Sequence, residues 1–163
     1  MKKTLTPNLT LYFNNIYKAK TKQGSTKSNL VTIGIGGNIG NVIKRFKKLF
    51  LMLKGDSRFT IIQTSPILKN PPFGYVEQDY FINAIIVLKT NLSPQQCLKS
   101  FQRYENRFKR TRSFKDAPRT LDIDIIFYNN LKINTINLIV PHKDYKNRDS
   151  VLIPLSYIDS KLC

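Results

Sequence analysis

Residues 121–128 have the sequence Leu-Asp-Ile-Asp-Ile-Ile-Phe-Tyr, in which two acids interrupt an otherwise apolar stretch. Such a run of β-branched and aromatic side chains, followed here by the turn residues Asn129 and Asn130, predicts a buried strand. Side chains alternate between the two faces of a strand, so Asp122 and Asp124 are expected on one face, with their α-carbons about 6–7 Å apart. This strand is the last strong element of the predicted fold.

Two helices are predicted upstream of this strand. In the nearer one, Ser93 is a candidate N-cap, Pro94 suits the first helical position, and Gln96 completes a capping box. Its buried face has helical spacing and consists of Cys97, Phe101, Tyr104 and Phe108. The earlier helix, over residues 41–53, has an apolar stripe formed by Val42, Phe46, Leu49, Phe50 and Leu53.

Three further strands complete the order of elements. They are predicted over residues 30–36, 58–68 and 80–88, with a loop over 69–78. Pro66 favours a sheet edge or a strand end. The order β-α-β-β-α-β is that of a ferredoxin-like α+β fold, a mainly antiparallel sheet with two helices on one face. Many functions share this fold, so the order alone names none. Short segments around residues 133, 138–140 and 151–155 close the chain.

Basic residues dominate the charge of the 163-residue chain. There are 27 Lys and Arg against 10 Asp and Glu, which gives a formal net charge of +17. Such a chain attracts polyanions, namely nucleic acid, anionic membrane or phosphorylated small molecules. It has no run of about 18 apolar residues, no secretory h-region, and only two cysteines, Cys97 and Cys163. We therefore expect a cytoplasmic monomer with no membrane partner, no disulfide framework and no zinc site.

The chain is divided into a basic extension over residues 1–28 and one domain over residues 29–163. The extension has six lysines and no acid, and we expect it to be partly ordered. Helical spacing of its apolar residues, Leu9, Tyr12, Phe13, Ile16 and Tyr17, predicts a short amphipathic helix. Residues 21–29 are polar and fit a linker. An organelle transit peptide is the alternative interpretation of this extension.

Several residue groups could carry chemistry. The carboxylates of Asp122 and Asp124 could share Mg²⁺ ions, although a half-exposed strand is the plainer interpretation. Seven cations between residues 103 and 119 could grip phosphate oxygens, or could simply form a solvated helix end. His142, the single histidine, could donate to a phosphate. The glycines at 34–40 miss the dinucleotide-binding spacing by one residue and favour a tight turn.

A further group could hold a planar heterocycle. Phe73 and Phe81 offer flat apolar faces, and Asn70 and Asn83 offer amide donors and acceptors. Taken alone, these residues also fit a proline turn followed by a core strand.

Residues 115–126 resemble the signature of the 6-hydroxymethyl-7,8-dihydropterin pyrophosphokinase family of folate biosynthesis. Four other stretches agree with the family pattern: residues 35–38, 70–74, 80–84 and 140–148. The resemblance covers about residues 30–158. It implies a ferredoxin-like fold and the transfer of pyrophosphate from ATP to the pterin hydroxymethyl group, with release of AMP.

The resemblance also implies residue roles. Two Mg²⁺ would be held by Asp122 and Asp124. Catalytic positions correspond to Arg112, Arg119, Asp122 and Asp124. ATP-binding positions correspond to Gln102, Glu105, Arg112, Arg119, Ile125, His142 and Arg148. Pterin-binding positions correspond to Asn70, Pro71, Phe73, Phe81 and Asn83. Residues 109–118 are expected to form a mobile lid over ATP.

The chain departs from the family pattern at three positions. Asp116 replaces a common aromatic residue, Asn70 replaces a common Thr, and Ser150 stands where a second ring would cover the pterin. Tyr145 or Val151 are candidate substitutes for that ring.

Two other functions fit parts of the sequence. An RNA-binding module of RRM topology has the same order of elements and suits the positive charge, but the RNP1 pattern is missing, so no specific nucleic-acid partner is expected. An inactive pterin-binding relative is the second alternative.

Overall fold

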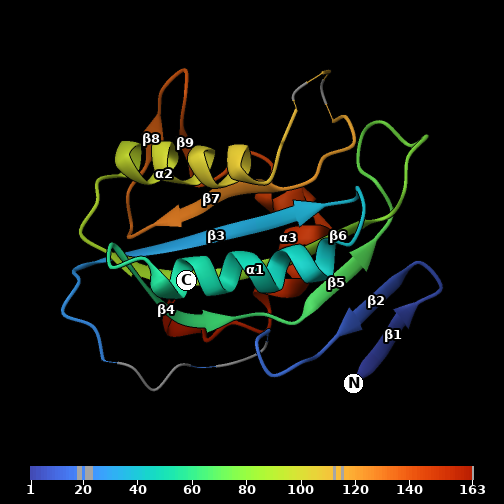
Figure 1. Cartoon of the computed structure of the whole chain (residues 1–163), viewed down its shortest axis with the longest axis horizontal. Coiled ribbons are helices and arrows are strands. Elements are labelled where there is room, and N and C mark those ends of the chain that lie inside the picture. The colour runs from blue at the N-terminus through green and yellow to red at the C-terminus, as the bar shows by residue number, and fades with distance from the viewer. Residues whose placement is uncertain (18–19, 21–23, 112, 115, 163) are drawn as a thin grey trace.

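The computed structural model describes residues 1–163 except 18–19, 21–23, 112, 115 and 163 (Figure 1). Its main sheet is antiparallel and has the strand order β1-β2-β5-β6-β3-β7, with β4 also paired to β6. The strands of this sheet are β1 (Lys2–Thr6), β2 (Leu9–Tyr12), β3 (Asn29–Gly37), β4 (Phe59–Thr64), β5 (Ile67–Asn70), β6 (Phe81–Thr90) and β7 (Asp122–Tyr128). The other elements are α1 (Val42–Gly55), α2 (Pro94–Arg107), β8 (Ile133–Asn134), β9 (Ile139–Val140), the 3-10 turns η1 (Tyr145–Asn147) and η2 (Ser160–Leu162), and α3 (Asp149–Leu155).

The predicted α+β order is confirmed, and local sequence explains where its helices begin. At α2 the Ser93 hydroxyl accepts a hydrogen bond from the Gln96 amide at 3.3 Å. The Gln96 side chain accepts one from the Ser93 amide at 2.8 Å, which completes the capping box. At α1 the side chain of Asn41 accepts a hydrogen bond from the Lys44 amide.

The strand predicted over residues 58–68 is wrong in one respect, because it is two strands. β4 and β5 lie end to end along one edge of β6, and the strand is interrupted between them at Ser65 and Pro66. Proline has no amide hydrogen to donate to the ladder. The Ser65 hydroxyl accepts the hydrogen bond of the Ile85 amide at this break, at 2.8 Å.

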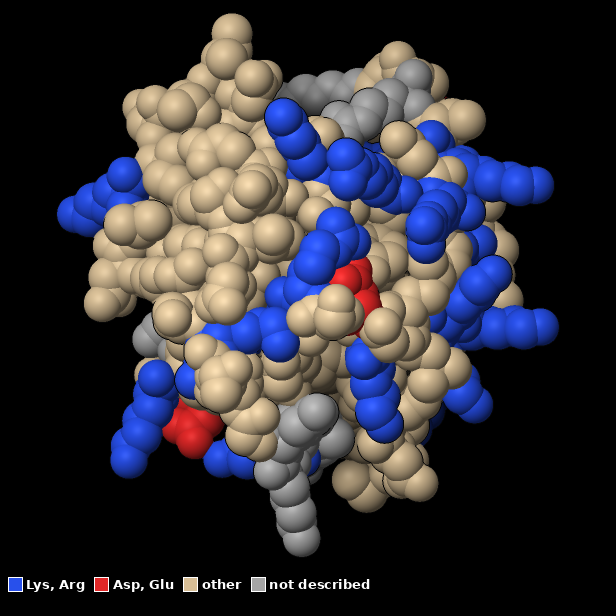
Figure 2. Space-filling view, turned by 60° about the vertical axis from the view of Figure 1, so that its left-hand side comes forward, with Lys and Arg blue, Asp and Glu red and all other residues tan. Residues whose placement is uncertain are grey.

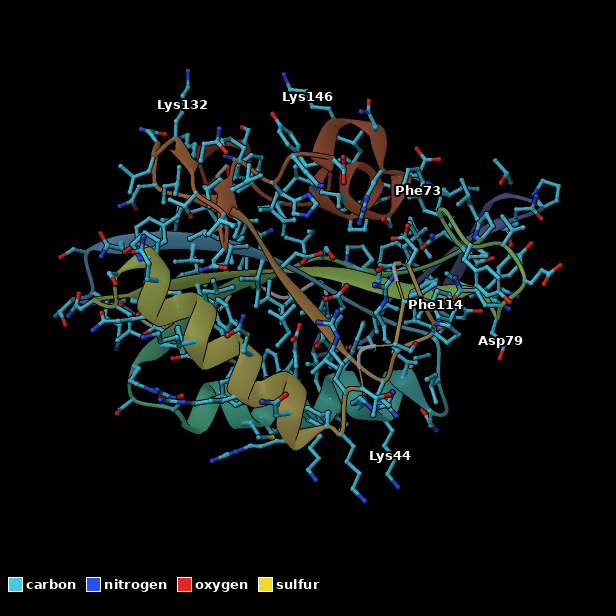
Figure 3. All side chains as sticks on the ribbon, turned by 90° about the horizontal axis from the view of Figure 1, so that it is seen from above. Lys44, Phe73, Asp79, Phe114, Lys132 and Lys146 are labelled. Carbon is cyan, nitrogen blue, oxygen red and sulfur yellow. The ribbon has the colours of Figure 1, made fainter. Side chains whose placement is uncertain are left out.

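The sheet separates two cores. Seen from above in Figure 3, α1 and α2 lie on one side of the sheet and α3 lies on the other. The larger core packs residues such as Ile33 and Ile35 of β3 against both helices. The smaller one joins Ile85 and Ile126 to Val151 of α3. The expected pair of helices on one face is confirmed, and the second face carries a cover of its own.

The helix predicted within residues 9–17 is wrong, because β1 and β2 form a hairpin there. β2 pairs with β5, so the hairpin extends the main sheet (Figure 1). The open edge of β5 offers backbone groups that a neighbouring strand satisfies, and this tertiary pairing overrides the helical spacing. Leu11 and Tyr17 are buried, and the Tyr17 hydroxyl donates to the Phe46 carbonyl of α1 at 2.9 Å.

Among the described residues, no helix has the length and apolar character needed to cross a membrane.

Candidate active site

Two carboxylates and one amide lie in register across the sheet. Asp122 of β7 pairs with Gly36 of β3, which pairs on its other side with Asn83 of β6. Asp124 likewise pairs with Gly34. Ile123 and Ile125 pack in the core under α1 and α2. Because side chains alternate along a strand, the carboxylates of Asp122 and Asp124 face the opposite side of the sheet, which carries α3. The predicted common face of the two acids is confirmed.

Two glycines of β3 allow neighbouring groups to approach the strand closely. A β-carbon on Gly36 would lie 2.5 Å from the side-chain oxygen of Asn83, and one on Gly37 would lie 2.6 Å from the Thr120 carbonyl oxygen. The tight turn expected here falls at Gly40, which has a φ of +66°. The glycines therefore permit both the turn and the close approach of the chain that leads into β7.

A buried ion-pair network ties the acids to α2. Glu105 is 3% exposed and accepts a hydrogen bond from the Ile123 amide at 2.8 Å. It also forms an ion pair with Arg110, whose guanidinium lies 2.7 Å from an Asp122 oxygen. Arg119 approaches the other Asp122 oxygen at 3.3 Å. Asp122 is thus held by two arginines, and α2 positions one of them through Glu105.

Asp124 has a different environment from Asp122. Its oxygen lies 3.9 Å from Nε2 of His142, and its side chain keeps 39% exposure. The pKa of Asp124 is raised, chiefly because surrounding protein displaces water and secondly because Asp122 is a like charge. The pKa of His142 is lowered by burial and then by Arg148. A raised carboxyl pKa beside a second carboxylate marks a place where a cation is favourable.

The chemistry of this acid pair suits a magnesium ion better than a transition metal. Within the described part of the chain, no group of three or more His, Cys, Asp or Glu side chains gathers into a metal cluster. Mg²⁺ uses few protein carboxylates and keeps water or phosphate oxygens as its other ligands. The two carboxylates therefore fit Mg²⁺ in the presence of a polyphosphate.

Two arginines stack on aromatic rings and keep free donors. The guanidinium of Arg119 lies 4.9 Å from the Phe81 ring centre, and that of Arg148 lies 5.1 Å from the ring centre of Phe73. In the described residues, Nε of each arginine is buried without a hydrogen-bond partner. Buried donors of this kind are normally satisfied, so both are available to anionic oxygens.

An apolar cavity opens beside Asp124. Its volume is about 220 Å³, and it lies between α2, β7 and the β8–β9 hairpin. Its walls include Ile125 and His142, which the sequence predicted, and Leu98, Ile136 and Leu138, which it did not. Gln102 is exposed on α2 and does not line this cavity.

A second cavity, of about 380 Å³, adjoins the predicted pterin segment. It is lined by Asn70, Pro71 and Phe73, by the start of α3 with Arg148 and Ser150, and by the hairpin residues Thr6, Asn8 and Leu9. Asn83 connects to it, because its amide donates to Asn70 at 2.7 Å. Local sequence does not indicate the hairpin contribution, because it depends on the pairing of β2 with the distant strand β5.

The substitutes expected for the second ring lie elsewhere. The ring of Tyr145 packs edge-on against that of Phe127, with ring centres 5.0 Å apart. Val151 belongs to α3 and is buried in the smaller core between this helix and the sheet. Neither lines the cavity that contains Ser150.

Phe114 and Asp116, from the predicted lid over residues 109–118, contact the loop that joins β5 to β6. The rings of Phe114 and Tyr75 meet edge-on at 5.3 Å, and the Gln78 side chain donates to the Asp116 carbonyl at 2.9 Å. Figure 3 shows Phe114 on the side of the molecule that carries Phe73 and Asp79. Arg112 of this loop lies outside the described residues.

Asn38 is a further residue of the site that was not predicted from the sequence. Its side chain accepts a hydrogen bond from the Arg119 amide at 2.9 Å and donates to Gln78 at 2.8 Å. It thereby joins the glycine turn to both loops of the site. The position of Asn38 directly after Gly37, in the predicted strand-to-helix turn, was the signal in the sequence that could have identified it.

The surface charge is mainly positive. On the face shown in Figure 2, basic side chains are spread widely and acidic ones form only small patches. With a net charge of +17, the protein attracts anionic ligands.

Comparison with known proteins places this site in context. The model of the family described as 7,8-dihydro-6-hydroxymethylpterin-pyrophosphokinase matches residues 32–160. The chain is similar to the 2-amino-4-hydroxy-6-hydroxymethyldihydropteridine pyrophosphokinase of Helicobacter pylori, with 47% identity over 131 residues, 79% of this chain and 80% of the relative. The enzymes of the same name from Campylobacter jejuni, at 45% identity over 79% of this chain and 82% of the relative, and Bacillus subtilis, at 36% over 80% and 78%, are also similar.

Proposed function

Because the chain belongs to the 7,8-dihydro-6-hydroxymethylpterin-pyrophosphokinase family, we propose that it transfers pyrophosphate from ATP to 6-hydroxymethyl-7,8-dihydropterin, a step of folate biosynthesis. The observation that carries the proposal is the position of the two carboxylates. Asp122 and Asp124 lie between an apolar cavity and the amides of Asn70 and Asn83. A nucleotide on one side and a heterocycle on the other would meet at the acids.

ATP enters this scheme with its base in the apolar cavity beside α2. The aliphatic walls, Ile125 and Leu138 among them, suit a flat purine, and Asp124 and His142 lie at the same cavity. His142 Nδ1 accepts a hydrogen bond from the Asp144 amide at 3.3 Å, so the neutral ring carries its proton on Nε2. That proton faces the region assigned to the phosphates.

The acid pair would hold two Mg²⁺ ions. Asp122 and Asp124 supply oxygen ligands on one face, and the remaining ligands would be water and ATP oxygens. When bound, the ions would neutralise phosphate charge and lower the pKa of the attacking hydroxyl group.

The arginines would neutralise the polyphosphate. Arg110 and Arg119 are paired with Asp122, and these pairs would exchange for phosphate oxygens when the nucleotide binds. Among the described residues, the Nε atoms of Arg119 and Arg148 have no hydrogen-bond partner, which supports this role. Arg112 remains a predicted contact in the same loop as Arg110.

The pterin would lie over the amide pair. Asn83 donates to Asn70. Within the described part of the chain no hydrogen bond reaches the Asn83 side-chain oxygen, so that oxygen could accept from an amino or ring N–H group of the heterocycle. Phe81 lies on the same face of β6 as Asn83, and its ring is buried under the guanidinium of Arg119, 4.9 Å from the ring centre. The ring could support one side of the heterocycle once Arg119 moves to the phosphates.

The reaction would proceed by in-line attack of the pterin hydroxymethyl oxygen on the β-phosphorus of ATP. A bond from that oxygen to the β-phosphorus forms, the bond from the β-phosphorus to the oxygen shared with the α-phosphate breaks, and AMP leaves with that oxygen. The hydroxyl proton passes to solvent. Positioning and charge neutralisation carry the catalysis, with no protein base required.

A product assay tests this function. Purified protein is mixed with ATP, Mg²⁺ and the pterin, and AMP is separated from ADP. Pterin-dependent AMP without ADP is expected. Formation of ADP would indicate a simple kinase, and tight pterin binding without turnover would indicate an inactive relative.

A further inference from the structure

The tip of the β1–β2 hairpin lies beside the pterin segment. β2 runs antiparallel to β5, with Thr10 opposite Lys69, so the chain before Thr10 continues past the end of β5 toward Asn70. Thr6 and Leu9 flank this tip and line the cavity of about 380 Å³ that Asn70 and Phe73 also line. The hairpin is therefore a wall of the cavity as well as an edge of the sheet.

The hairpin is fixed to the body of the protein by contacts further along the chain. Leu11 is fully buried against the sheet, and Tyr17 is 1% exposed. The Thr64 hydroxyl donates to the Ile16 carbonyl at 2.7 Å, and the Tyr17 hydroxyl donates to the Phe46 carbonyl at 2.9 Å. A segment held in this way presents its tip at a defined position.

One hydrogen bond links the tip directly to the pterin segment. The Tyr80 hydroxyl donates to the side-chain oxygen of Asn8 at 3.0 Å. Tyr80 immediately precedes Phe81, the ring on the sheet face beside Asn83. The ammonium group of Lys69 lies 5.3 Å from the Tyr80 ring centre and supports the same side chain. Asn8 thus restrains the end of the loop that leads into β6.

The far side of the cavity provides little apolar surface. It is formed by the start of α3, where Ser150 has no ring, and Tyr145 and Val151 pack away from it. A flat heterocycle needs apolar contact on both faces. Leu9 is the aliphatic side chain that the hairpin tip adds to this cavity.

We propose that the β1–β2 hairpin completes the pterin pocket of this protein, with Leu9 contacting the bicyclic heterocycle and Asn8 acting as a positioning residue through Tyr80. The hairpin lies before residue 32, where the match to the family model begins, so it is an addition to the matched region. The inference rests on the proposed function, since it assigns the heterocycle of that reaction to this cavity.

Point variants of the full chain test the proposal. Asn8→Ala, Leu9→Ala, Tyr80→Phe and the double variant Asn8→Ala/Tyr80→Phe are compared with wild type. Thr4→Ala is the matched control, because Thr4 belongs to β1 and is exposed but does not line the cavity. The pterin Kd is measured by the fluorescence of 6-hydroxymethylpterin with Mg²⁺ and α,β-methylene-ATP present. KM for each substrate, kcat and Tm are measured alongside.

The pterin Kd and KM should rise about three- to tenfold in Asn8→Ala and in Leu9→Ala, the size of one lost contact. KM for ATP and Tm should stay near wild type, which a merely structural role would not produce. The double variant should be no worse than either single variant, because both remove the same hydrogen bond.

Unchanged pterin Kd in Asn8→Ala and Leu9→Ala would overturn the hairpin proposal and leave the proposed function standing. If the wild type binds the pterin but forms no AMP, the proposed function fails, and the Kd comparison still decides the role of the hairpin. If the wild type binds no pterin, both proposals fail.

Discussion

Glu105 of α2 reaches across the open edge of β7 and accepts the backbone hydrogen bond of Ile123 at 2.8 Å. Ile123 lies between the two acids of the site, so this contact sets the position of both. The same carboxylate pairs with Arg110, which in turn contacts Asp122. A helix, an edge strand and Arg110, which we propose contacts phosphate, are thereby fixed to one another by a single buried carboxylate.

Replacing Glu105 should therefore weaken both the fold and the reaction. Glu105→Ala leaves the Ile123 amide without this acceptor and Arg110 without one of its two acids. We expect the free energy of unfolding to fall by about 2–3 kcal/mol, the range for a lost buried charged hydrogen bond. Urea titration measures this change. Glu77→Ala, at an exposed position, is the control and should be nearly neutral. Equal stability of the two variants would contradict the network.

Gly36 should tolerate no side chain. A β-carbon there would lie 2.5 Å from the Asn83 side-chain oxygen, so Gly36→Ala must displace the amide that donates to Asn70. Overpacking of this kind costs about 1–3 kcal/mol, and KM for the pterin should rise about tenfold. Steady-state kinetics with varied pterin measures the effect.

Gly55→Ala is the matched control for Gly36→Ala. A β-carbon at Gly55 meets nothing within 4 Å, at the end of α1. The substitution should be neutral or stabilise the protein by up to about 1 kcal/mol, without a change in KM. A normal pterin KM in Gly36→Ala would show that the displaced amide has no part in binding.

Chelation and Asp124→Asn should produce the same defect by two routes. EDTA should abolish turnover, and added Mg²⁺ should restore it. Asp124→Asn keeps the shape of the side chain but removes its charge, so kcat should fall about a hundredfold or more and the Mg²⁺ concentration needed for half-maximal rate should rise.

Asp79→Asn provides the control for charge alone. Asp79 is exposed, and its side chain points away from the body of the protein (Figure 3). Its kcat and Mg²⁺ dependence should match wild type. Turnover of the EDTA-treated enzyme would contradict the assignment of the acid pair.

Stability at acid pH should depend on Asp56. Hydrogen bonds from Arg58, foremost, and from the Tyr104 hydroxyl at 2.7 Å lower the pKa of Asp56 to about 2. A lowered pKa means that the ionised form stabilises the fold. This contribution is therefore complete above about pH 4, the unfolded-state pKa, and is lost as the pH falls toward 2.

Comparison with Asp56→Asn isolates this contribution. The wild type should be more stable than the variant by about 2 kcal/mol at pH 6, and the difference should vanish near pH 2. Guanidinium titrations at several pH values measure it. A difference that stays constant with pH would show that the carboxylate charge is not responsible.

The features predicted correctly from sequence depend on neighbouring residues. The capping box of Ser93 and Gln96 is complete within one turn of helix, and alternation along β7 places Asp122 and Asp124 on one face. The break at Pro66 was signalled by the missing amide hydrogen, although the length of the run suggested one strand.

The features that sequence reasoning missed depend on distant contacts. The helical spacing between Leu9 and Tyr17 competes with pairing to β5, more than 50 residues later, and the pairing prevails. Arg110 gave no local signal that distinguished it from the other cations of its run, because its partners come from α2 and β7.

The fate of the β-phosphate tests the central claim most directly. The protein is incubated with Mg²⁺, the pterin and ATP labelled with ³²P at the β-position, and the products are separated by chromatography. Attack at the β-phosphorus predicts that the label moves entirely into the pterin diphosphate while unlabelled AMP accumulates, and that Asp124→Asn slows this transfer. Label recovered in ADP, beside a pterin monophosphate, would contradict the account.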